Sequence, residues 1–433
     1  MTKRINLYVE KVFLLELFLL IFTKLLLEFI YIKFLNKVYL YAGFNLDIVA
    51  IKYIFGWIIF LGCYFILHKQ RKLYIFEIYL LLFLLYFLPN VVFYSLSSQN
   101  TSDFLTLVLP FIFLVFANSN KELFTIYKLK YGKVMLFFIT ILILGIVIYN
   151  YYLHTGGNYV VNFKKVYQFR ALYDQNSNTG IFGYINSWAM KIFAVFLFAW
   201  SLNKGKLLLV FFSLSIILFL FIFSGHKSVL QGIIIVLFFY ILFMFKDRGL
   251  ILIFGFFSLI ALTTFLTLYV NQNMIGSIII RRLLFVPVNL NFIYFEYFSH
   301  NDFIYWSNSV LKYFIEYPFE VKVTKIIGAY LDKPDMAANT GSFASGYMHA
   351  EYFGVIIYTL IISAVLYFIN IMAKNMDKYI VLAIITIPII TMFVSSDLLT
   401  SLLTHGLLIS MIILWLYEHD EYRIKLGFFK FKI

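Results

Sequence analysis

The sequence predicts an all-α polytopic membrane protein, and three observations support this prediction. Hydrophobic residues make up 63% of the 433 residues and charged residues only 13%, whereas soluble domains are about half apolar and about a quarter charged. The apolar residues gather in runs long enough to cross a membrane, and Lys and Arg gather in every second connection between these runs. We therefore expect one integral-membrane domain, residues 1–433, with about twelve transmembrane helices.

The individual spans follow from the length of each apolar run. A membrane-spanning helix needs about 20 predominantly apolar residues. Applied along the chain, this length predicts spans near residues 11–34, 46–67, 74–94, 102–117, 134–153, 182–201, 207–223, 229–245, 249–270, 346–372, 379–394 and 397–417.

The orientation of the spans follows from the basic connections, because cytoplasmic loops retain Lys and Arg. Basic residues gather at the N-terminus and in the connections 68–72, 120–133, 203–206, 246–248, 374–378 and 422–432. Both termini are therefore predicted to be cytoplasmic, and the remaining connections external. Two external loops are long, residues 154–181 and 271–345. In the second, "SNSVLKYFIEYP" (307–318) places its apolar residues on one helical face, which predicts an interfacial helix.

The sequence lacks the usual motifs of ATP-driven transport, zinc proteolysis and serine hydrolysis. The chain has no GxxxxGK[ST] phosphate loop, no HExxH, no CxxC and no GxSxG motif. We therefore expect no metal and no cofactor. The net charge of +14 partly reflects the cytoplasmic loops, so nucleic acid is not an expected partner. The external loops also lack a DxD pair that would hold a divalent ion against a diphosphate, so an external phosphate ligand would need cations instead.

The predicted external face carries three groups of cations. They are Arg170 with Lys164 and Lys165 in the first long loop, His226 and Lys227 in "FSGHKSVLQG", and Arg281 and Arg282 in "IIIRRLLFV". Each group has a simpler explanation: a solvated loop, a tight turn, or contacts to lipid headgroups. Three basic groups on one side nevertheless favour an anion site, because Arg presents a planar fork of donors to phosphate.

Ionisable residues also fall inside or beside predicted spans, where they are costly unless they face a cavity or one another. His349 and Glu351 lie at the outer end of the tenth span, where His349 is a candidate general base or a packed polar residue. Asp397 and His405 are eight residues apart, which predicts that they share one helical face.

Three stretches together resemble the bacterial O-antigen polymerases of the Wzy family. They are "SGHKS" between two spans, "RRLLFVPVNLNFIYFEYFSHNDFIYWSNS", and "NTGSFASGYMHAEYFGVIIY" at the mouth of a late span. The family carries an Arg-x-x-x-x-x-Pro stretch followed by Tyr-x-x-Phe-Phe-like and Tyr-Trp-Ser elements. The corresponding residues here are Arg281 or Arg282, Pro287, Tyr297, Phe298, Tyr305, Trp306 and Ser307. Arg170 departs from the family pattern, because it precedes Gly180 by one residue too few.

This resemblance implies a C-type glycosyltransferase-like fold and metal-independent, inverting glycosyl transfer. A growing polysaccharide would move from undecaprenyl diphosphate onto a second undecaprenyl-diphosphate-linked oligosaccharide, at the periplasmic face of a bacterial inner membrane. Membrane lipids and a chain-length regulator protein are the other partners that the resemblance implies. As negative charge collects on the departing diphosphate, fixed cations would stabilise it.

The resemblance and the residues together give a site hypothesis. The diphosphate is assigned to Arg170, His226, Lys227, Arg281 and Arg282, the sugar rings to Tyr297, Tyr305 and Trp306, and the general base to His349, with Asp302, His300 and Glu351 as further candidates. One alternative is an O-antigen ligase that transfers the chain to lipid A-core, although the His-Asn pair typical of ligases is missing here. Another is a lipid-linked oligosaccharide flippase, although no inverted repeat is evident.

Overall fold

The computed structural model describes residues 2–121, 123, 126–127, 129–162, 165–177, 180–417, 423–426 and 429–432. These residues are predominantly helical, and the chain divides into two compact units. Each unit combines segments that are far apart in the sequence. Unit 1 contains Met1–Ser119, Leu242–Leu366 and Ile389–Thr400, and unit 2 contains Asn120–Ile241, Tyr367–Pro388 and Ser401–Ile433.

Unit 1 contains the N-terminal helices and the helices on both sides of the second long loop. Short π-helical or 3₁₀ segments, labelled η, interrupt several of them. The elements are α1 (Thr2–Ile30), η1 (Tyr31–Leu35), α2 (Asn36–Tyr39), η2 (Leu40–Ala42), α3 (Ala50–Lys69), α4 (Phe76–Leu82), η3 (Phe83–Phe87), α5 (Leu88–Leu96), α6 (Thr101–Ala117), α13 (Arg248–Leu268), α14 (Asn273–Gly276), η5 (Ser277–Phe285), α15 (Val286–Phe298), α16 (Val323–Tyr330) and most of α17 (Ser342–Met372).

Unit 2 contains the middle of the chain and most of its C-terminal helices. Its elements are α7 (Gly132–Thr155), α8 (Val166–Ser177), α9 (Phe182–Trp188), η4 (Ala189–Phe193), α10 (Ala194–Lys204), α11 (Leu207–Ser224), α12 (Ser228–Leu242), η6 (Ala373–Asn375), most of α18 (Lys378–Val394), α20 (Leu407–Tyr417), β1 (Arg423–Leu426) and β2 (Phe429–Lys432). The helix α19 (Leu398–Leu403) is divided between the two units. The two strands pair as an antiparallel hairpin, with Arg423 opposite Lys432, and every other element of the described residues is helical, as the all-α prediction requires.

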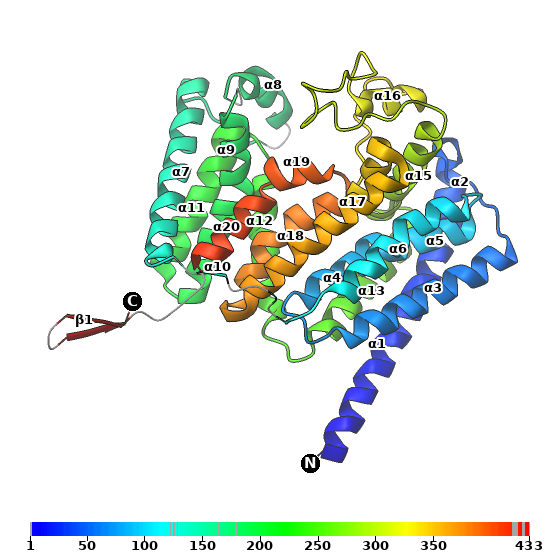
Figure 1. The fold of residues 1–433 in the computed structure, drawn as a ribbon, viewed down its shortest axis with the longest axis horizontal. Coiled ribbons are helices and arrows are strands. Elements are labelled where there is room, and N and C mark those ends of the chain that lie inside the picture. The colour runs from blue at the N-terminus through cyan, green and yellow to red at the C-terminus, as the bar shows by residue number, and fades with distance from the viewer. Residues whose placement is uncertain are drawn as a thin grey trace. The chain divides into compact units, whose positions relative to one another are not determined.

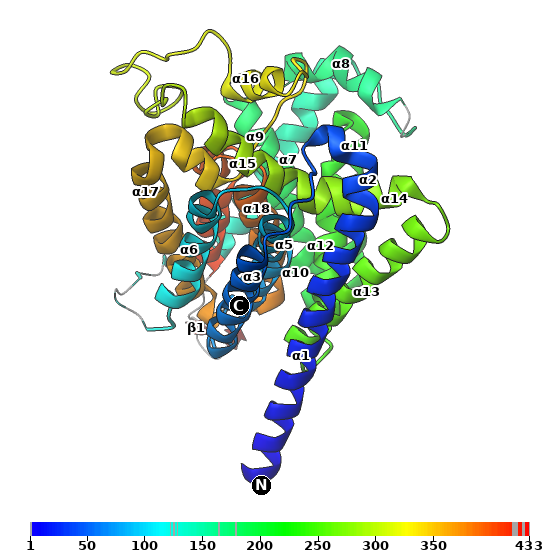
Figure 2. The ribbon, with the colours of Figure 1, turned by 90° about the vertical axis from the view of Figure 1, so that its right-hand side faces the viewer.

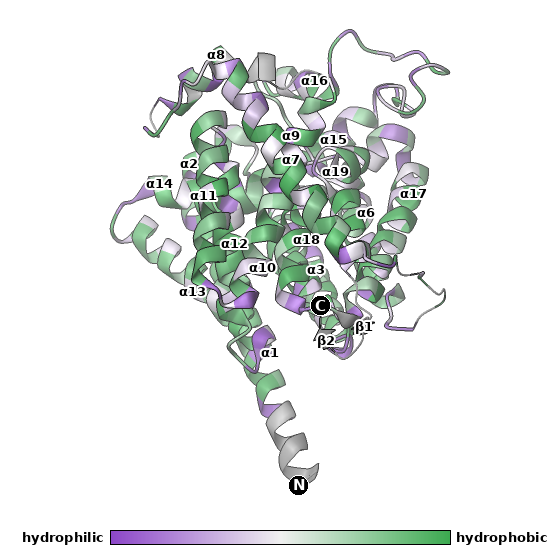
Figure 3. Ribbon diagram, turned by 90° about the vertical axis from the view of Figure 1, so that its left-hand side faces the viewer, coloured by the Kyte–Doolittle hydropathy of each residue, from purple (hydrophilic) through white to green (hydrophobic). Residues whose placement is uncertain are grey.

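The protein is membrane-embedded, because nine helices of the described residues are long and apolar enough to cross a membrane. Figure 3 shows hydrophobic residues along most of the length of the helices that are visible in this view, such as α7, α11 and α12. The nine are Ala50–Lys69, Phe76–Leu96, Gly132–Thr155, Phe182–Lys204, Leu207–Ser224, Arg248–Leu268, Asn273–Phe298, Ser342–Met372 and Leu398–Tyr417. Eight of them coincide with predicted spans, and three further predicted spans correspond to the shorter apolar helices Thr101–Ala117, Ser228–Leu242 and Lys378–Val394.

The ninth helix, Asn273–Phe298, lies inside the predicted second external loop. It begins beside the end of α13, where a Cβ on Gly276 would be 2.6 Å from Thr267 Oγ1. Farther along, the Phe285 ring lies 5.4 Å from the Tyr31 ring, and Asn289 Nδ2 donates to Ala42 O at 3.1 Å. The helix thus packs along one end of unit 1. The opposite end of α13 carries an ion pair, Arg248 to Glu77 at 3.2 Å.

The remaining helices of unit 1 pack around this framework. Figure 1 shows α3, α5 and α6 side by side, and Figure 2 shows α1 running along α13. Aromatic side chains fill the spaces between them, such as the Tyr94 and Phe104 rings, stacked 3.9 Å apart. Burial of these rings removes large apolar areas from contact with lipid and water and fixes the ends of α5 and α6 beside each other.

The predicted interfacial helix over 307–318 is wrong. Residues 305–314 form consecutive turns, and the next helix along this loop is α16. Within the protein the apolar face that predicted a helix is largely uncovered, because Val310 is 61% exposed and Phe314 85% exposed. A short helix without tertiary packing is marginal in stability. In the first long loop α8 occupies residues 166–177, and Lys164 lies outside the described residues.

Asp397 and His405 do not share a helical face, contrary to the spacing prediction. The last predicted span is broken: α19 ends at Leu403, and Gly406, at φ +80°, precedes α20. The two side chains therefore take different partners. His405 Nδ1 accepts a hydrogen bond from Lys191 Nζ at 2.8 Å within unit 2, whereas Asp397 bonds to residues of unit 1.

Candidate functional site

The segment after α15 is held by its own side chains. Ser299 Oγ donates to Glu296 O at 2.8 Å, and Asn301 Nδ2 donates to Tyr297 O at 2.7 Å. These bonds satisfy carbonyls that the last turn of a helix leaves without partners. These two bonds fix the backbone of residues 299–301 against the end of α15, and so they fix the position of His300 and the start of the segment that carries Asp302.

The following residues run alongside the start of α17. Ile304 N donates to Met348 O at 3.2 Å, and Tyr305 N donates to His349 O at 3.0 Å. Tyr305 and Trp306 both have positive φ, at 42° and 57°. Such values cost free energy for residues other than glycine and persist only where surrounding contacts impose them. The backbone bonds to α17 are such contacts.

His349 is buried within a network of aromatic and acidic side chains. Its ring stacks on the Trp306 indole with a centroid separation of 4.9 Å, and its Nδ1 accepts the Trp306 backbone N–H at 3.1 Å. Because Nδ1 accepts, Nε2 carries the proton and faces Asp397 Oδ2 at 3.4 Å. Both ring nitrogens are therefore engaged by protein groups. His349 is 1% exposed, so it corresponds to the packed polar residue that the sequence left open.

Asp397 completes this network from the connection between α18 and α19. Its Oδ2 also accepts the Tyr358 hydroxyl at 2.8 Å, and its Oδ1 accepts the Leu399 N–H at 2.9 Å. Burial raises the pKa of the Asp397 carboxyl, but the hydrogen bonds from His349, Tyr358 and Leu399 lower it more, so the pKa lies below its usual value. Trp306 Nε1 donates to the Tyr358 hydroxyl at 3.1 Å and closes the network.

The helix α17 breaks directly after His349. Ala350 and Glu351 leave the helical region, and Glu351 adopts φ 52° and ψ −141°. Gly346 and Gly354 then approach so closely that a Cβ on Gly346 would be 2.9 Å from Gly354 O. In a straight helix residues eight apart are separated by about 12 Å. The break therefore folds α17 back on itself and exposes Glu351 at the turn.

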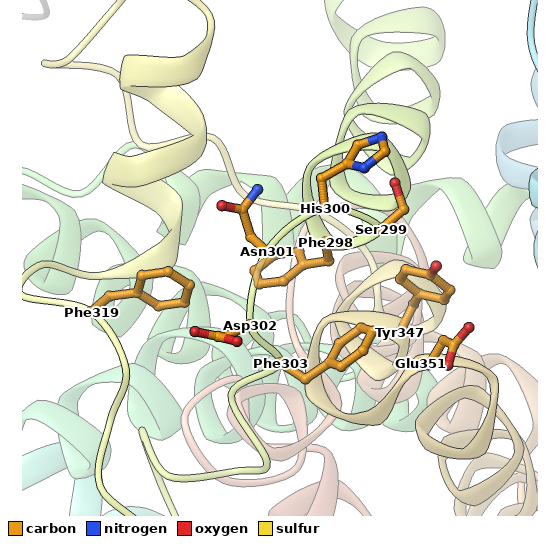
Figure 4. Close-up of a pocket in the computed structure, with 9 residues that line it drawn as sticks. All are labelled: Phe298, Ser299, His300, Asn301, Asp302, Phe303, Phe319, Tyr347 and Glu351. Carbon is orange, nitrogen blue, oxygen red and sulfur yellow. The ribbon is translucent and has the colours of Figure 1, made fainter.

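These elements surround a cavity of about 600 Å³. Figure 4 shows Asp302 between Phe319 and Phe303, and Glu351 beside Tyr347 on the opposite side. The lining thus combines two carboxylates, one imidazole and several aromatic rings. The full set is Phe298, Ser299, His300, Asn301, Asp302, Phe303, Phe319, Tyr347 and Glu351. Three base candidates from the sequence therefore meet here, namely Asp302, His300 and Glu351.

The predicted sugar platforms lie at or beside these elements without lining the cavity. Tyr297 contacts the Tyr330 ring edge-on at 5.4 Å, and Tyr305 is 46% exposed beside Phe303. Trp306 presents one face to His349. Sequence reasoning missed Tyr347, Phe319 and Tyr358, since an aromatic residue in a membrane protein gives no local signal that separates a site from packing.

The predicted diphosphate cations belong to different units. In unit 1 the Arg281 guanidinium lies 4.3 Å from the centre of the Tyr39 ring, and Arg282 is exposed. In unit 2 α8 packs on the turn that follows α11, where a Cβ on Gly225 would be 3.1 Å from Arg170 Cγ. This contact brings Arg170 next to the turn of His226 and Lys227. Among the described residues, none of these five lines the cavity.

No metal centre is evident in the part of the chain that the structure describes, since it contains no group of three or more His, Cys, Asp or Glu side chains placed to hold an ion. Comparison with known proteins adds no assignment: no family model, no curated protein and no solved structure matches this chain.

Proposed function

We propose that the protein is an O-antigen polymerase that extends a lipid-linked polysaccharide at the periplasmic face of a bacterial inner membrane. One observation carries this proposal. Two of the segments that resemble the Wzy family, around residues 281–309 and 339–358, contribute most of the lining of one cavity with carboxylates and aromatic rings. Sugars are bound by this combination, since carboxylates accept hydroxyl hydrogen bonds and aromatic rings contact the apolar faces of the rings.

The reaction assigns different tasks to the two carboxylates. An acceptor hydroxyl must lose its proton while its oxygen attacks C1 of the donor sugar and the diphosphate departs. We assign the role of general base, which accepts this proton, to Asp302. This side chain is exposed in the cavity, and hydrogen bonds to α17 fix its loop. Glu351 would bind a sugar hydroxyl. His349 holds the Trp306 segment in place, and both of its nitrogens are already occupied.

The departing diphosphate needs positive charge, and the five predicted cations remain the proposed source. Arg281 and Arg282 belong to unit 1, and Arg170, His226 and Lys227 to unit 2. A fixed cation that strengthens its contact as charge develops lowers the barrier without a metal.

The proposed topology keeps twelve crossings with both termini cytoplasmic. The helix Asn273–Phe298 begins beside Thr267 and ends beside a cavity shared with Ser98 and Asn100, so both of its ends lie at one end of unit 1. This arrangement supports a helix that lies along the outer boundary, as interfacial helices do. The segment 299–341 then remains external, together with the cavity.

The test is a lipopolysaccharide gel from a polymerase-null strain complemented with variants. We expect the native chain to restore a ladder and Asp302→Asn to leave core plus one repeat, since loss of a general base typically costs about 100-fold or more. Arg281→Ala, Arg282→Ala and Lys227→Ala should shorten or abolish the ladder. The exposed Asp335, which does not line this cavity, provides the matched control Asp335→Asn, which should give a full ladder.

Two other results would contradict the proposal. A native chain that cannot complement the polymerase-null strain, but restores attached chains in a ligase-null strain with bare core, would identify a ligase. A full-length ladder from Asp302→Asn would exclude Asp302 as the base.

A further inference from the structure

A second cavity of about 460 Å³ adjoins the first. The two share Ser299, His300 and Tyr347 as a common wall. Beyond this wall the second cavity is lined by Ser98, Gln99, Asn100, Ser102, Asp103, Phe292, Phe295, Glu296 and Tyr352. It therefore lies between the connection before α6, the end of α15 and the start of α17, all within unit 1.

Both linings have the same chemistry. Hydroxyl, amide and carboxylate groups alternate with aromatic rings, and Tyr347 faces both cavities. Polar residues outnumber aromatic ones, eight to four in the second cavity and five to four in the first, so hydrogen bonds to hydroxyl groups would orient a ligand there. Glu296 is itself fixed, because its Oε1 accepts the Tyr330 hydroxyl at 2.8 Å.

The charged side chains that line the two cavities are almost all acidic. Four carboxylates line the cavities, Asp103 and Glu296 in the second and Asp302 and Glu351 in the first. Among the described lining residues there is no Lys or Arg, and His300 is the one basic side chain. A carboxylate on a ligand would therefore meet four like charges and no fixed cation, at distances where screening by salt is incomplete.

We propose that the two cavities are adjoining subsites for two consecutive sugar residues of a glycan that carries no acidic sugar. This inference rests on the proposed function and concerns the acceptor glycan: its terminal sugar would lie at Asp302 in the first cavity and its next sugar in the second, while the donor diphosphate is assigned to cations that line neither cavity. It adds the substrate class: neutral repeat units, including N-acetylated ones, are accepted, and uronic or other acidic sugars are excluded. Tyr347, in the shared wall, contacts the residues on both sides.

The experiment measures binding without turnover, on the full chain in lipid nanodiscs, by isothermal titration at pH 7. The probes are chitotriose, which is neutral, and trigalacturonic acid, which carries three carboxylates. We expect chitotriose to bind at least tenfold more tightly. In Asp103→Asn/Glu296→Gln the ratio of the two affinities should fall severalfold, whereas Asp335→Asn should leave it unchanged.

A second measurement uses only the native protein, so its result does not depend on whether a variant folds. On the native protein, 0.5 M salt should narrow the difference between the two probes, because only the acidic one is repelled. Equal or tighter binding of trigalacturonic acid would overturn the inference, and so would failure of both probes to bind. The ladder of the complemented strain separates the two proposals. A ladder without selectivity refutes only the neutral subsites, and selectivity without a ladder refutes only the polymerase.

Discussion

Asp397 joins three parts of unit 1 through one carboxylate. It accepts hydrogen bonds from His349 in α17, from Tyr358 farther along α17, and from the first turn of α19. Through His349 and Trp306 the same network fixes the loop that carries Asp302. Asp397 thus fixes, through His349 and Trp306, the position of Asp302, to which the proposed function assigns the acceptor proton.

We expect Asp397→Ala to destabilise the protein by about 1–3 kcal/mol, because it leaves the buried partners of the carboxylate without an acceptor. Asp397→Asn, which retains one oxygen, should cost less. The check is the thermal unfolding midpoint from tryptophan fluorescence in detergent. A midpoint for the alanine variant equal to that of the native chain would show that the network contributes nothing.

The contribution of the Asp397 carboxylate to stability should depend on pH in a defined direction. The pKa of Asp397 is lowered in the folded state, so its contribution is present above the pKa of the unfolded chain and is lost as the pH falls through the folded pKa. The difference in unfolding midpoint between the native chain and Asp397→Asn should therefore be constant between pH 8 and pH 5, and should shrink below about pH 4. If this difference in unfolding midpoint already shrinks between pH 7 and pH 6, the pH dependence arises from a group other than Asp397.

Glu351 combines a cavity carboxylate with a backbone conformation that favours glycine. Its φ of 52° and ψ of −141° resemble the first central position of a type II′ turn, where Gly is dominant. We expect Glu351→Gly to raise stability by on the order of 1 kcal/mol and to lower polymer formation. Glu351→Gln, which keeps the strain, should lower polymer formation without raising the unfolding midpoint.

At this scale the sequence identified ionisable residues that the fold brings together, but it did not identify the partners of His349 and Asp397. Asp302 and His300 were predicted to lie in an external loop and Glu351 at the outer end of the tenth span, and the structure brings all three to one cavity. The pairing of His349 with Asp397 spans 48 residues, and no local spacing rule reaches that far. The rule that was used linked Asp397 with His405, because it assumed an unbroken helix.

At the scale of elements, the folded-back α17 depends on two glycines. A Cβ on Gly354 would overlap the carbonyl oxygen of Gly346. We therefore expect Gly354→Ala to destabilise the protein by about 1–3 kcal/mol, as overpacking does, and to shorten the ladder by displacing Glu351. Gly255 in α13 is a matched control, because a Cβ there meets nothing within 4 Å. Equal unfolding midpoints for Gly354→Ala and Gly255→Ala would contradict the close approach.

Helix positions were predictable where a long apolar run decides them, as in eight of the nine long helices. Asn273–Phe298 was missed because Arg281 and Arg282 interrupt its run, and the structure accommodates Arg281 over the Tyr39 ring. The 307–318 helix failed for the opposite reason. Its apolar residues have helical spacing, but Val310 and Phe314 are not covered by the rest of the protein.

At the scale of the whole molecule, the proposed sidedness depends on whether Asn273–Phe298 crosses the membrane. If it lies along one end of unit 1, Ser98 and Asn301 are on the same side, and if it crosses, the loop after it changes sides relative to α13. Positive-inside counting cannot decide this, because long external loops are not governed by their own charges. The contacts of Gly276 and of the second cavity with one end of unit 1 favour the first arrangement.

Cysteine labelling tests this topology directly, because the only native cysteine, Cys63, is buried. On a Cys63→Ser background, we expect Ser98→Cys and Asn301→Cys to react with a membrane-impermeant maleimide added to intact spheroplasts. Lys206→Cys, in a connection predicted to be cytoplasmic, should react only after the membrane is permeabilised. All three positions are exposed, so a difference between them reports sidedness. If Ser98→Cys and Asn301→Cys are labelled from opposite sides, Asn273–Phe298 crosses the membrane. If Lys206→Cys is labelled in intact spheroplasts, the orientation of the whole protein is the reverse of the proposed one, and the cavity does not face the periplasm.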